Sequence, residues 1–399
     1  MKAPDSPRSI FGFGVLLMSI THGIIHVSNS IFPILLPVLQ DEFNLTYSQL
    51  GLMVSVPTFF RVVASIPCGY LADRFTAKRI IALSFMIQIA SSLMVAWSRS
   101  PWMLVLSMSL LTLTFTMYHP ASLSYTTKLV SESNRAKAIG LQTAGGPLGM
   151  ALGPLSLSFL LPFGWRTAYL FWIIPVLPAL FVIWRMKPQA DETFQSGEGD
   201  SQDLVREVES PKKGLLSTIS MGVVIFLVYS SFRTSGLRFI GSFLSLYLTD
   251  IRLLSVSEAS LILGLVSLVG VFAAPLGGLF SDKWGYKKWL LIVLSLSTLC
   301  IAIAFLAPTT VLFVIFYFSY RFFSFSGNPA QVSIISRLMP RSRQGLGYSL
   351  SFLPGSIVGS IIPIIAGILA DQMGLSVLFP IGIVVLGMAL AFLQFVVKV

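Results

Sequence analysis

Long apolar stretches separated by short polar connections run the length of the chain. A helix of about 20 apolar residues crosses about 30 Å of hydrocarbon. The pattern therefore predicts twelve membrane-spanning helices, at about residues 10–38, 47–71, 79–97, 101–127, 138–161, 164–185, 215–249, 256–280, 288–306, 309–337, 344–370 and 374–397. The one long polar stretch, Lys187 to Lys213, separates the sixth from the seventh helix and has the composition of a flexible linker.

A polar motif at residues 69–79, between the second and third predicted helices, recurs at residues 278–288. The repeated positions include Gly69, Asp73 and Arg74 in the first copy and Gly278, Asp282 and Lys283 in the second. The prolines after His119 and Asn328 align at the same offset of 209 positions. The repeat predicts an all-α membrane protein of two pseudo-symmetric six-helix halves, residues 1–186 and 214–399, joined by a cytoplasmic linker at residues 187–213.

Composition and charge agree with this architecture. Hydrophobic residues make up 55% of the chain and charged residues 11%, against about 25% charged in soluble domains. Twenty lysines and arginines fall in the N-terminus, the C-terminus or even-numbered connections, and the odd-numbered connections hold only Arg99, Arg166 and Arg252. By the positive-inside rule both termini and the linker are cytoplasmic, so the net charge of +11 needs no nucleic-acid partner.

The loop motif resembles that of the major facilitator superfamily, and the resemblance extends over nearly the whole chain. It departs from the family pattern at Thr76, where the family prefers glycine. A second signature, that of helix 5 in the family's antiporters, matches at Gly140, Gly149, Gly153 and Pro154 and departs at residues 155–157. The motif around His119 and this helix resemble the fosmidomycin-resistance-type branch.

The resemblance implies that the two loop motifs, at Gly69, Asp73 and Arg74 and at Gly278, Asp282 and Lys283, act as a conformational gate on the cytoplasmic side. A carboxylate such as Asp73 can accept hydrogen bonds at the start of a neighbouring helix. For Lys78 and Arg79 a purely topogenic role is the alternative. For the small residues and proline of helix 5 we prefer tight helix packing.

Charged and titratable side chains within the predicted spans are the strongest candidates for a site, since such groups are costly in a bilayer. They are Arg61, Arg233, Arg238, Arg321, His22, His26 and His119. Asp and Glu occur only at helix ends or in loops, so a bound anion would compensate the arginines.

Helical spacing places His22, His26 and Asn29 on one face, and Arg321 and Asn328 on another. The family lines its central cavity with helices 1, 4, 7 and 10, which hold all these candidates except Arg61. Arg233 and Arg238 lie about 140° apart around their helix; the repeat favours Arg238 as the one that faces the cavity. Structural roles remain the alternative: His22 and His26 as packed neutral histidines, and Arg61 and His119 bonded to backbone carbonyls.

These observations predict a secondary transporter for a small organic anion (a carboxylate, phosphonate or phosphate ester) that works by alternating access in the cytoplasmic membrane, coupled to protons or another ion. Arginines would bind the anion, and histidines would orient it or carry protons. A proton-linked drug efflux antiporter is the alternative, and a non-transporting receptor or scaffold is another. We expect no enzyme activity, no cofactor and no metal, because no nucleotide loop, metal-ligand spacing or nucleophile constellation is present. We expect a monomer in the lipid bilayer.

Overall fold

The computed structural model describes residues 11–131, 134–186, 220–339 and 344–397. They form two compact units: the described residues up to 32 and from 60 to 186 belong to the first, and residues 33–59 and the described residues from 220 onward belong to the second. The predicted linker lies outside the described residues, so the predicted division into residues 1–186 and 214–399 stays a prediction.

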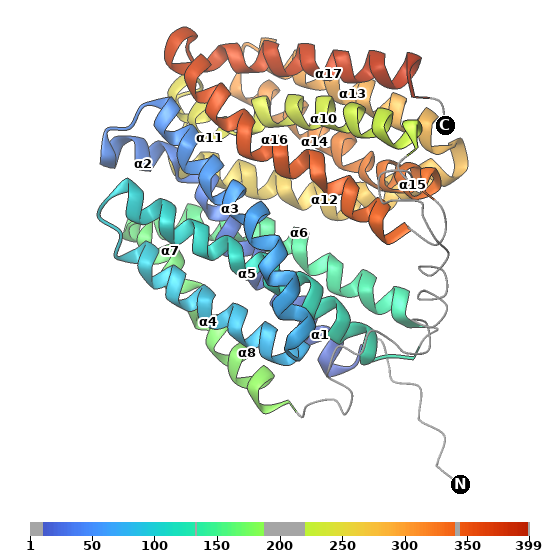
Figure 1. Ribbon diagram of the computed structural model, residues 1–399. Helices are drawn as coiled ribbons and strands as arrows, with labels where there is room; N and C mark the ends of the chain where they lie inside the picture. Colours follow the sequence, from blue (N-terminus) through green and yellow to red (C-terminus); the bar gives the residue numbers. More distant parts are fainter. Residues whose placement is uncertain (1–10, 132–133, 187–219, 340–343, 398–399) are drawn as a thin grey trace. The chain divides into compact units, whose positions relative to one another are not determined.

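The described residues form helices and connecting turns and contain no strand (Figure 1). The elements that begin in the N-terminal part of the chain are α1 (Phe13–Ile31), η1 (Phe32–Ile34), α2 (Leu36–Phe43), α3 (Tyr47–Arg74), α4 (Ala77–Ala96), α5 (Pro101–Lys128), α6 (Arg135–Leu160), η3 (Leu161–Phe163), α7 (Arg166–Phe171) and α8 (Ile173–Arg185). The C-terminal part contains α10 (Met221–Gly241), α11 (Leu244–Leu246), the π-helical turn η5 (Tyr247–Ile251), α12 (Val256–Trp284), α13 (Tyr286–Leu306), α14 (Thr310–Ser326), α15 (Asn328–Leu338), α16 (Gln344–Met373), η7 (Leu375–Val377) and α17 (Leu378–Phe395).

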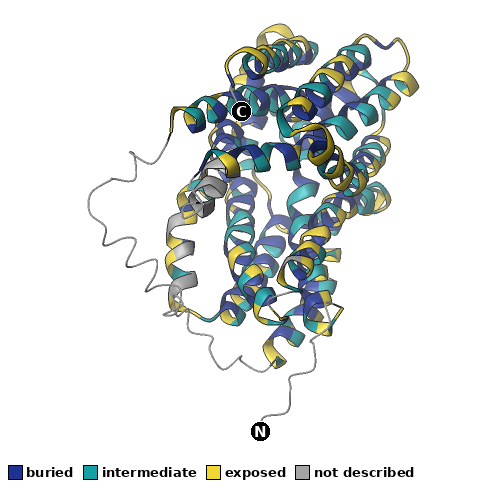
Figure 2. Ribbon diagram, turned by 90° about the vertical axis from the view of Figure 1, so that its right-hand side faces the viewer, coloured by how far each residue is buried: buried dark blue, intermediate teal, exposed yellow. Residues whose placement is uncertain are grey.

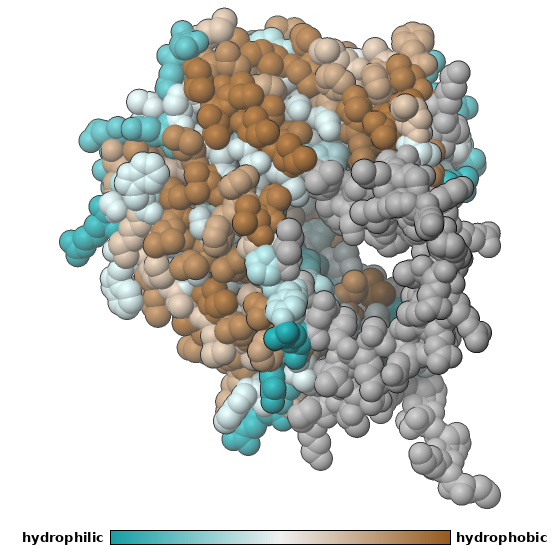
Figure 3. All heavy atoms as spheres, viewed as in Figure 1, coloured by the Kyte–Doolittle hydropathy of each residue, from teal (hydrophilic) through white to brown (hydrophobic). Residues whose placement is uncertain are grey.

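Eleven segments of the described residues are long and apolar enough to cross a membrane. The remaining predicted span corresponds to α3, which has 28 residues. Large apolar side chains such as Phe159, Trp184 and Phe272 are about 70% exposed on the outer faces of these helices. The face in Figure 3 is accordingly covered over much of its area by hydrophobic atoms. The fold is the predicted all-α, twelve-helix membrane fold.

Several helix starts follow directly from the local sequence. The Ser100 hydroxyl accepts the amide N–H of Met103 at 3.2 Å and caps α5, which begins at Pro101. Ser255 and Glu258 form a capping box at the start of α12. Caps of this kind satisfy amide groups that have no partner within the helix.

Three predicted helices are interrupted, and prolines explain the interruptions. The predicted helix at 10–38 breaks at η1, which contains Pro33, and continues as α2. The predicted helix at 164–185 divides into α7 and α8 just ahead of Pro175, and that at 309–337 divides at Gly327, two residues ahead of Pro329. Proline has no amide hydrogen and clashes with the preceding turn, which favours a break at these three places, where a continuous helix was the wrong prediction. Pro120 and Pro154, by contrast, lie inside the continuous helices α5 and α6.

The predicted helix at 215–249 also differs from the structure. The described part begins α10 at Met221, and α10 ends at Gly241. The chain then turns through α11 and η5 before α12. Each unit has its own apolar core, with Phe85 and Tyr118 in the first and Phe226 and Phe313 in the second. Buried residues face the neighbouring helices, and exposed residues lie on the outer helix faces (Figure 2).

Candidate functional site

Two glycine-lined helices, α1 and α6, position the first group of candidate residues. A Cβ atom on Gly149 would lie only 2.7 Å from the carbonyl carbon of Gly23, and a Cβ on Gly153 would lie 2.7 Å from the Val27 carbonyl oxygen. Gly145 packs in the same way against the backbone of Ser19. The backbones can approach this closely only because side chains are missing.

We call this close contact between α1 and α6, made by Gly145, Gly149 and Gly153, the glycine seam. It gives two glycines of the predicted helix-5 motif a packing role. Gly149 and Gly153 belong to the seam, and Pro154 follows them within α6. Gly140 has no atom within 4 Å of the position where a Cβ would stand, so it takes no part in the contact. Sequence reasoning missed Gly145, although its four-residue spacing from Gly149 is visible in the sequence.

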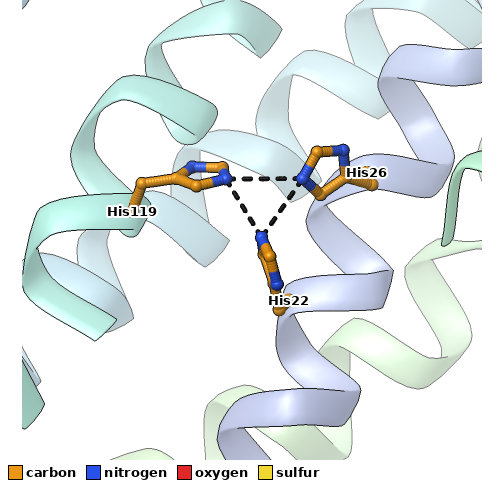
Figure 4. Close-up of side chains that lie close together, drawn as sticks. All are labelled: His22, His26 and His119. Atoms are coloured by element: carbon orange, nitrogen blue, oxygen red, sulfur yellow. Dashed lines mark hydrogen bonds between the residues drawn. The ribbon is translucent and has the colours of Figure 1, made fainter. Parts of the chain in front are cut away.

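The three histidines of the chain meet within the first unit. His22 and His26 lie one turn apart on α1, and His119 projects from α5 (Figure 4). The Nε2 atom of His22 is 3.1 Å from that of His119 and 3.2 Å from that of His26, and the third separation is 3.3 Å. His22 is buried, and the other two are half-buried.

Backbone carbonyl groups orient two of these rings. The Nδ1 atom of His22 lies 2.8 Å from the carbonyl oxygen of Gln142, and that of His119 lies 2.7 Å from the carbonyl oxygen of Phe115. A carbonyl oxygen can only accept, so Nδ1 carries the hydrogen in both rings. In the neutral form, Nε2 of His22 and of His119 is then a hydrogen-bond acceptor that points toward the common centre.

Gly146 of α6 closes this cluster on another side. A Cβ atom there would lie 3.0 Å from Cε1 of His22 and 3.3 Å from Nε2 of His26. The Arg61 guanidinium of α3 lies 5.5 Å from the centre of the Phe115 ring, and the centre of the Phe115 ring lies 3.8 Å from that of His119, with the two rings tilted by 39°. A positive charge therefore lies near the histidines.

Asn29 is placed differently from the two histidines on its helix. Its amide donates to the carbonyl of Ile25 at 3.1 Å, one turn earlier in α1. The amide is therefore engaged by its own helix backbone.

The second unit holds Arg233 in a cage of neutral oxygen atoms. Its guanidinium donates to Oε1 of Gln331 at 2.7 Å, to the carbonyl of Ser324 at 2.9 Å and to Oδ1 of Asn328 at 3.1 Å. Arg233 is 7% exposed. Sequence reasoning identified Arg233 and Asn328 but missed Gln331, whose amide also donates to the Ser230 hydroxyl at 2.6 Å.

Arg238 and Arg321 occupy other faces of the same unit. The Arg238 guanidinium lies beside Gly359 of α16, 3.2 Å from the position of a Cβ on that glycine. Since Arg233 contacts α14 and α15, the two arginines of α10 point to different neighbours, as their spacing predicts. The guanidinium of Arg321 lies 4.3 Å from the centre of the Phe325 ring, and its buried Nε has no hydrogen-bond partner among the described residues.

The loop motifs are described in part. The surroundings of Gly69 and the side chain of Asp73 lie outside the described part of the chain, and the guanidinium carbon of Arg74 lies 4.3 Å from the centre of the Tyr70 ring. In the second copy, Asp282 accepts a hydrogen bond from the Tyr286 hydroxyl at 2.9 Å, and Lys283 is exposed.

Close helix packing in the second copy occurs one residue before the repeated glycine. A Cβ on Gly278 would meet Pro329 at 4.0 Å, an ordinary contact, whereas one on Gly277 would lie 2.6 Å from the carbonyl carbon of Ser326. The gate role of these residues stays a prediction.

Comparison with known proteins assigns the family. The sequence profile described as Major Facilitator Superfamily matches residues 18–252 and 221–399, which together cover nearly all of the chain. The chain belongs to the major facilitator superfamily. This finding agrees with the predicted family and identifies the protein as a multi-pass membrane transporter rather than an enzyme.

Among curated members of the superfamily, the chain is 24% identical to a probable sugar efflux transporter of Mannheimia succiniciproducens over 66% of its own length and 64% of that protein. It is 25% identical to the hexuronate transporter of Bacillus subtilis, over 90% and 88% of the two chains. It is 23% identical to the fosmidomycin resistance protein of Escherichia coli, over 71% and 69%.

A solved structure of the superfamily has the same fold. It is the crystal structure of a bacterial homolog to the human lysosomal transporter Spinster in an inward-facing and unoccupied conformation. The TM-score is 0.78 at 18% identity, over 96% of this chain and 95% of that chain.

Proposed function

We propose that this superfamily member is a secondary active transporter of a small organic anion, such as a carboxylate, a phosphonate or a phosphate ester. It works by alternating access in the cytoplasmic membrane, with both termini on the cytoplasmic side. The helix-5 motif, Gly140, Gly149, Gly153 and Pro154, favours export.

The observation that carries the proposal is an excess of positive charge within the membrane-spanning helices. Arg61, Arg233 and Arg321 are buried or half-buried, and among the described residues their recorded partners are neutral oxygen atoms and aromatic rings. Charges in a bilayer are stabilised by opposite charges or by neutral hydrogen-bond partners. An anionic substrate supplies the missing negative charge.

Arg321 is the arginine we assign to the substrate first. Its Nε hydrogen is unused, whereas the guanidinium of Arg233 already donates to three oxygen atoms. A planar guanidinium can bind a carboxylate or phosphate through two parallel hydrogen bonds. Stacking on Phe325 holds its plane in place.

The names of the relatives lend partial support. One transports hexuronate, which is an organic anion, and it aligns over most of both chains. Another is named as a sugar transporter. A sugar acid and the corresponding neutral sugar are therefore the informative pair of ligands.

The test is thermal unfolding of the purified protein with glucuronate and with glucose, which have nearly the same shape and differ in charge. A ligand at 100 times its dissociation constant stabilises the folded protein by about 2.7 kcal/mol. We expect glucuronate, or another anion of a panel that includes phosphonates and phosphate esters, to raise the melting temperature, and glucose to leave it unchanged. Arg321→Gln should abolish the response, and Arg99→Gln, at an exposed position, should retain it.

Two results would refute the proposal. One is a melting temperature that cationic or neutral drugs raise and that no anion raises, which would favour a drug efflux antiporter. The other is a normal anion response in Arg321→Gln. For an anion that does stabilise the protein, uptake into proteoliposomes would show transport, and binding without uptake would favour a receptor.

A further inference from the structure

We propose that His22, His26 and His119 form a binding site for one divalent transition-metal ion of the zinc class. The inference concerns the first unit alone and does not depend on the anion assignment of Arg321. The sequence has no metal-ligand spacing because His119 lies 93 residues after His26, so only the fold brings the three rings together.

The separations of the three Nε2 atoms fit such an ion. Zinc binds histidine nitrogen at about 2.0–2.1 Å in tetrahedral geometry, which places two ligand nitrogens about 3.3–3.4 Å apart. The three observed separations are 3.1, 3.2 and 3.3 Å. An ion slightly out of the plane of the three atoms is then within bonding distance of all of them.

The ring orientations fit as well. Each pair of rings is inclined by 74° to 81°, so the nitrogen-bearing edges meet at the centre and the ring faces do not stack (Figure 4). The carbonyl groups of Gln142 and Phe115 hold Nδ1–H of His22 and His119. Such outer hydrogen bonds are the usual means of fixing the tautomer and orientation of a metal-bound histidine.

Hydrogen bonds among three neutral histidines cannot satisfy the Nε2 lone pairs of both His22 and His119. Nε2 of His22 and of His119 are both acceptors, yet they lie 3.1 Å apart. A neutral His26 can donate one Nε2 hydrogen, to one of the two. A cation at the centre would satisfy all three lone pairs at once.

The surroundings also suggest the remaining ligand. Three histidines leave one of four tetrahedral positions open, as in zinc sites that bind water or an anion. The Arg61 guanidinium, 5.5 Å from the centre of the Phe115 ring, adds a positive charge near the site. The summed charge favours an anion over a neutral molecule in the open position.

Cobalt(II) is the probe for this site, because four-coordinate Co²⁺ absorbs strongly in the visible range and substitutes for zinc. The protein is purified through a tag without histidine, so that the three histidines of the chain are the only ones present. After treatment with a chelator it is titrated with Co²⁺ in the absence of organic anions. We expect one saturable site per chain with a four-coordinate spectrum, and displacement of the cobalt by one equivalent of Zn²⁺.

Variants decide where the ion binds. His119→Gln should lower the affinity at least tenfold, and if it does not fold, His26→Gln provides the same comparison. Replacing Cys68 and Cys300, the two buried cysteines, by serine should leave the spectrum unchanged. An unfolding transition by tryptophan fluorescence confirms that each variant is folded.

Two outcomes would overturn the assignment. Absence of a saturable cobalt signal in the wild type would mean that the three histidines do not bind a divalent transition-metal ion. An equal signal in wild type and in the folded histidine variant would place the ion elsewhere. Because no organic anion is present, neither outcome affects the test of Arg321.

Discussion

Replacing Gly149 by alanine tests the packing of α1 against α6. The added Cβ would lie 2.7 Å from the carbonyl carbon and 2.8 Å from the Cα of Gly23, and nearer still to the carbonyl oxygen. Ordinary contact begins at 3.4 Å, so the two backbones must separate by about 0.7 Å or more. Overpacking of this kind costs about 1–3 kcal/mol.

Gly140→Ala is the matched control, because it makes the same change in the same helix where no atom lies within 4 Å of the new Cβ. Alanine is better than glycine in a helix interior by about 1 kcal/mol, and both variants gain this term. The difference between the two variants therefore isolates the steric overlap.

The assay is thermal unfolding in a mild detergent, followed by the fluorescence of the seven tryptophans. We expect Gly149→Ala to melt below wild type and Gly140→Ala to melt at or above it. Equal melting temperatures for the two variants would refute the close contact between α1 and α6. A metal titration of Gly149→Ala should also show weaker binding, since α6 supplies the carbonyl that orients His22.

Two further predictions concern polar contacts of the second unit. Asp371→Ala should lower the free energy of unfolding by about 1 kcal/mol, the usual cost of losing a helix cap. The Asp371 carboxylate accepts hydrogen bonds from the amide N–H groups of Tyr47 at 2.8 Å and Ser48 at 2.9 Å, at the start of α3. Thermal unfolding measures the change, and a variant as stable as wild type would contradict the cap. Gln331→Leu should cost about 1.5–3 kcal/mol, the value of a hydrogen bond to a charged group, because it leaves Nη1 of Arg233 without its 2.7 Å partner. Gln331→Glu keeps an oxygen there and adds a negative charge next to the guanidinium, so it should be at least as stable as wild type; a loss equal to that of Gln331→Leu would show that the contact with Arg233 does not matter.

The sequence predicted the fold well where local signals and periodicity agree. The helices expected at 79–97 and 101–127 are observed at Ala77–Ala96 and Pro101–Lys128, because Thr76 and Ser100 cap them. The repeat, the apolar spans and the loop motif led to the family that the sequence profile confirms.

The three helix breaks beside prolines have a common physical origin. Hydrophobic periodicity continues through Pro33, Pro175 and Pro329 because the apolar faces continue, but the backbone hydrogen bonds do not. The long hydrophobic run therefore hid the breaks at η1, between α7 and α8, and at Gly327.

The candidate site was predictable as a set of residues but not as an arrangement. Spacing placed His22 and His26 on one face of a helix, and burial cost identified the arginines. That His119 meets the pair depends on how α5 packs against α1, and no spacing in the sequence specifies this packing. The neutral oxygen atoms around Arg233 come from three residues of two helices, and no single-sequence pattern marks them.

The glycine seam also fixes the register of two helices. Gly145, Gly149 and Gly153 are four residues apart, which corresponds to steps of about 6 Å along a helix. A screw motion of α6 by one residue would put Leu148 or Met150 where Gly149 now lies. Sliding of α6 along α1 by one residue would therefore create steric overlap, and we expect the two helices to move together as one rigid pair during a conformational change.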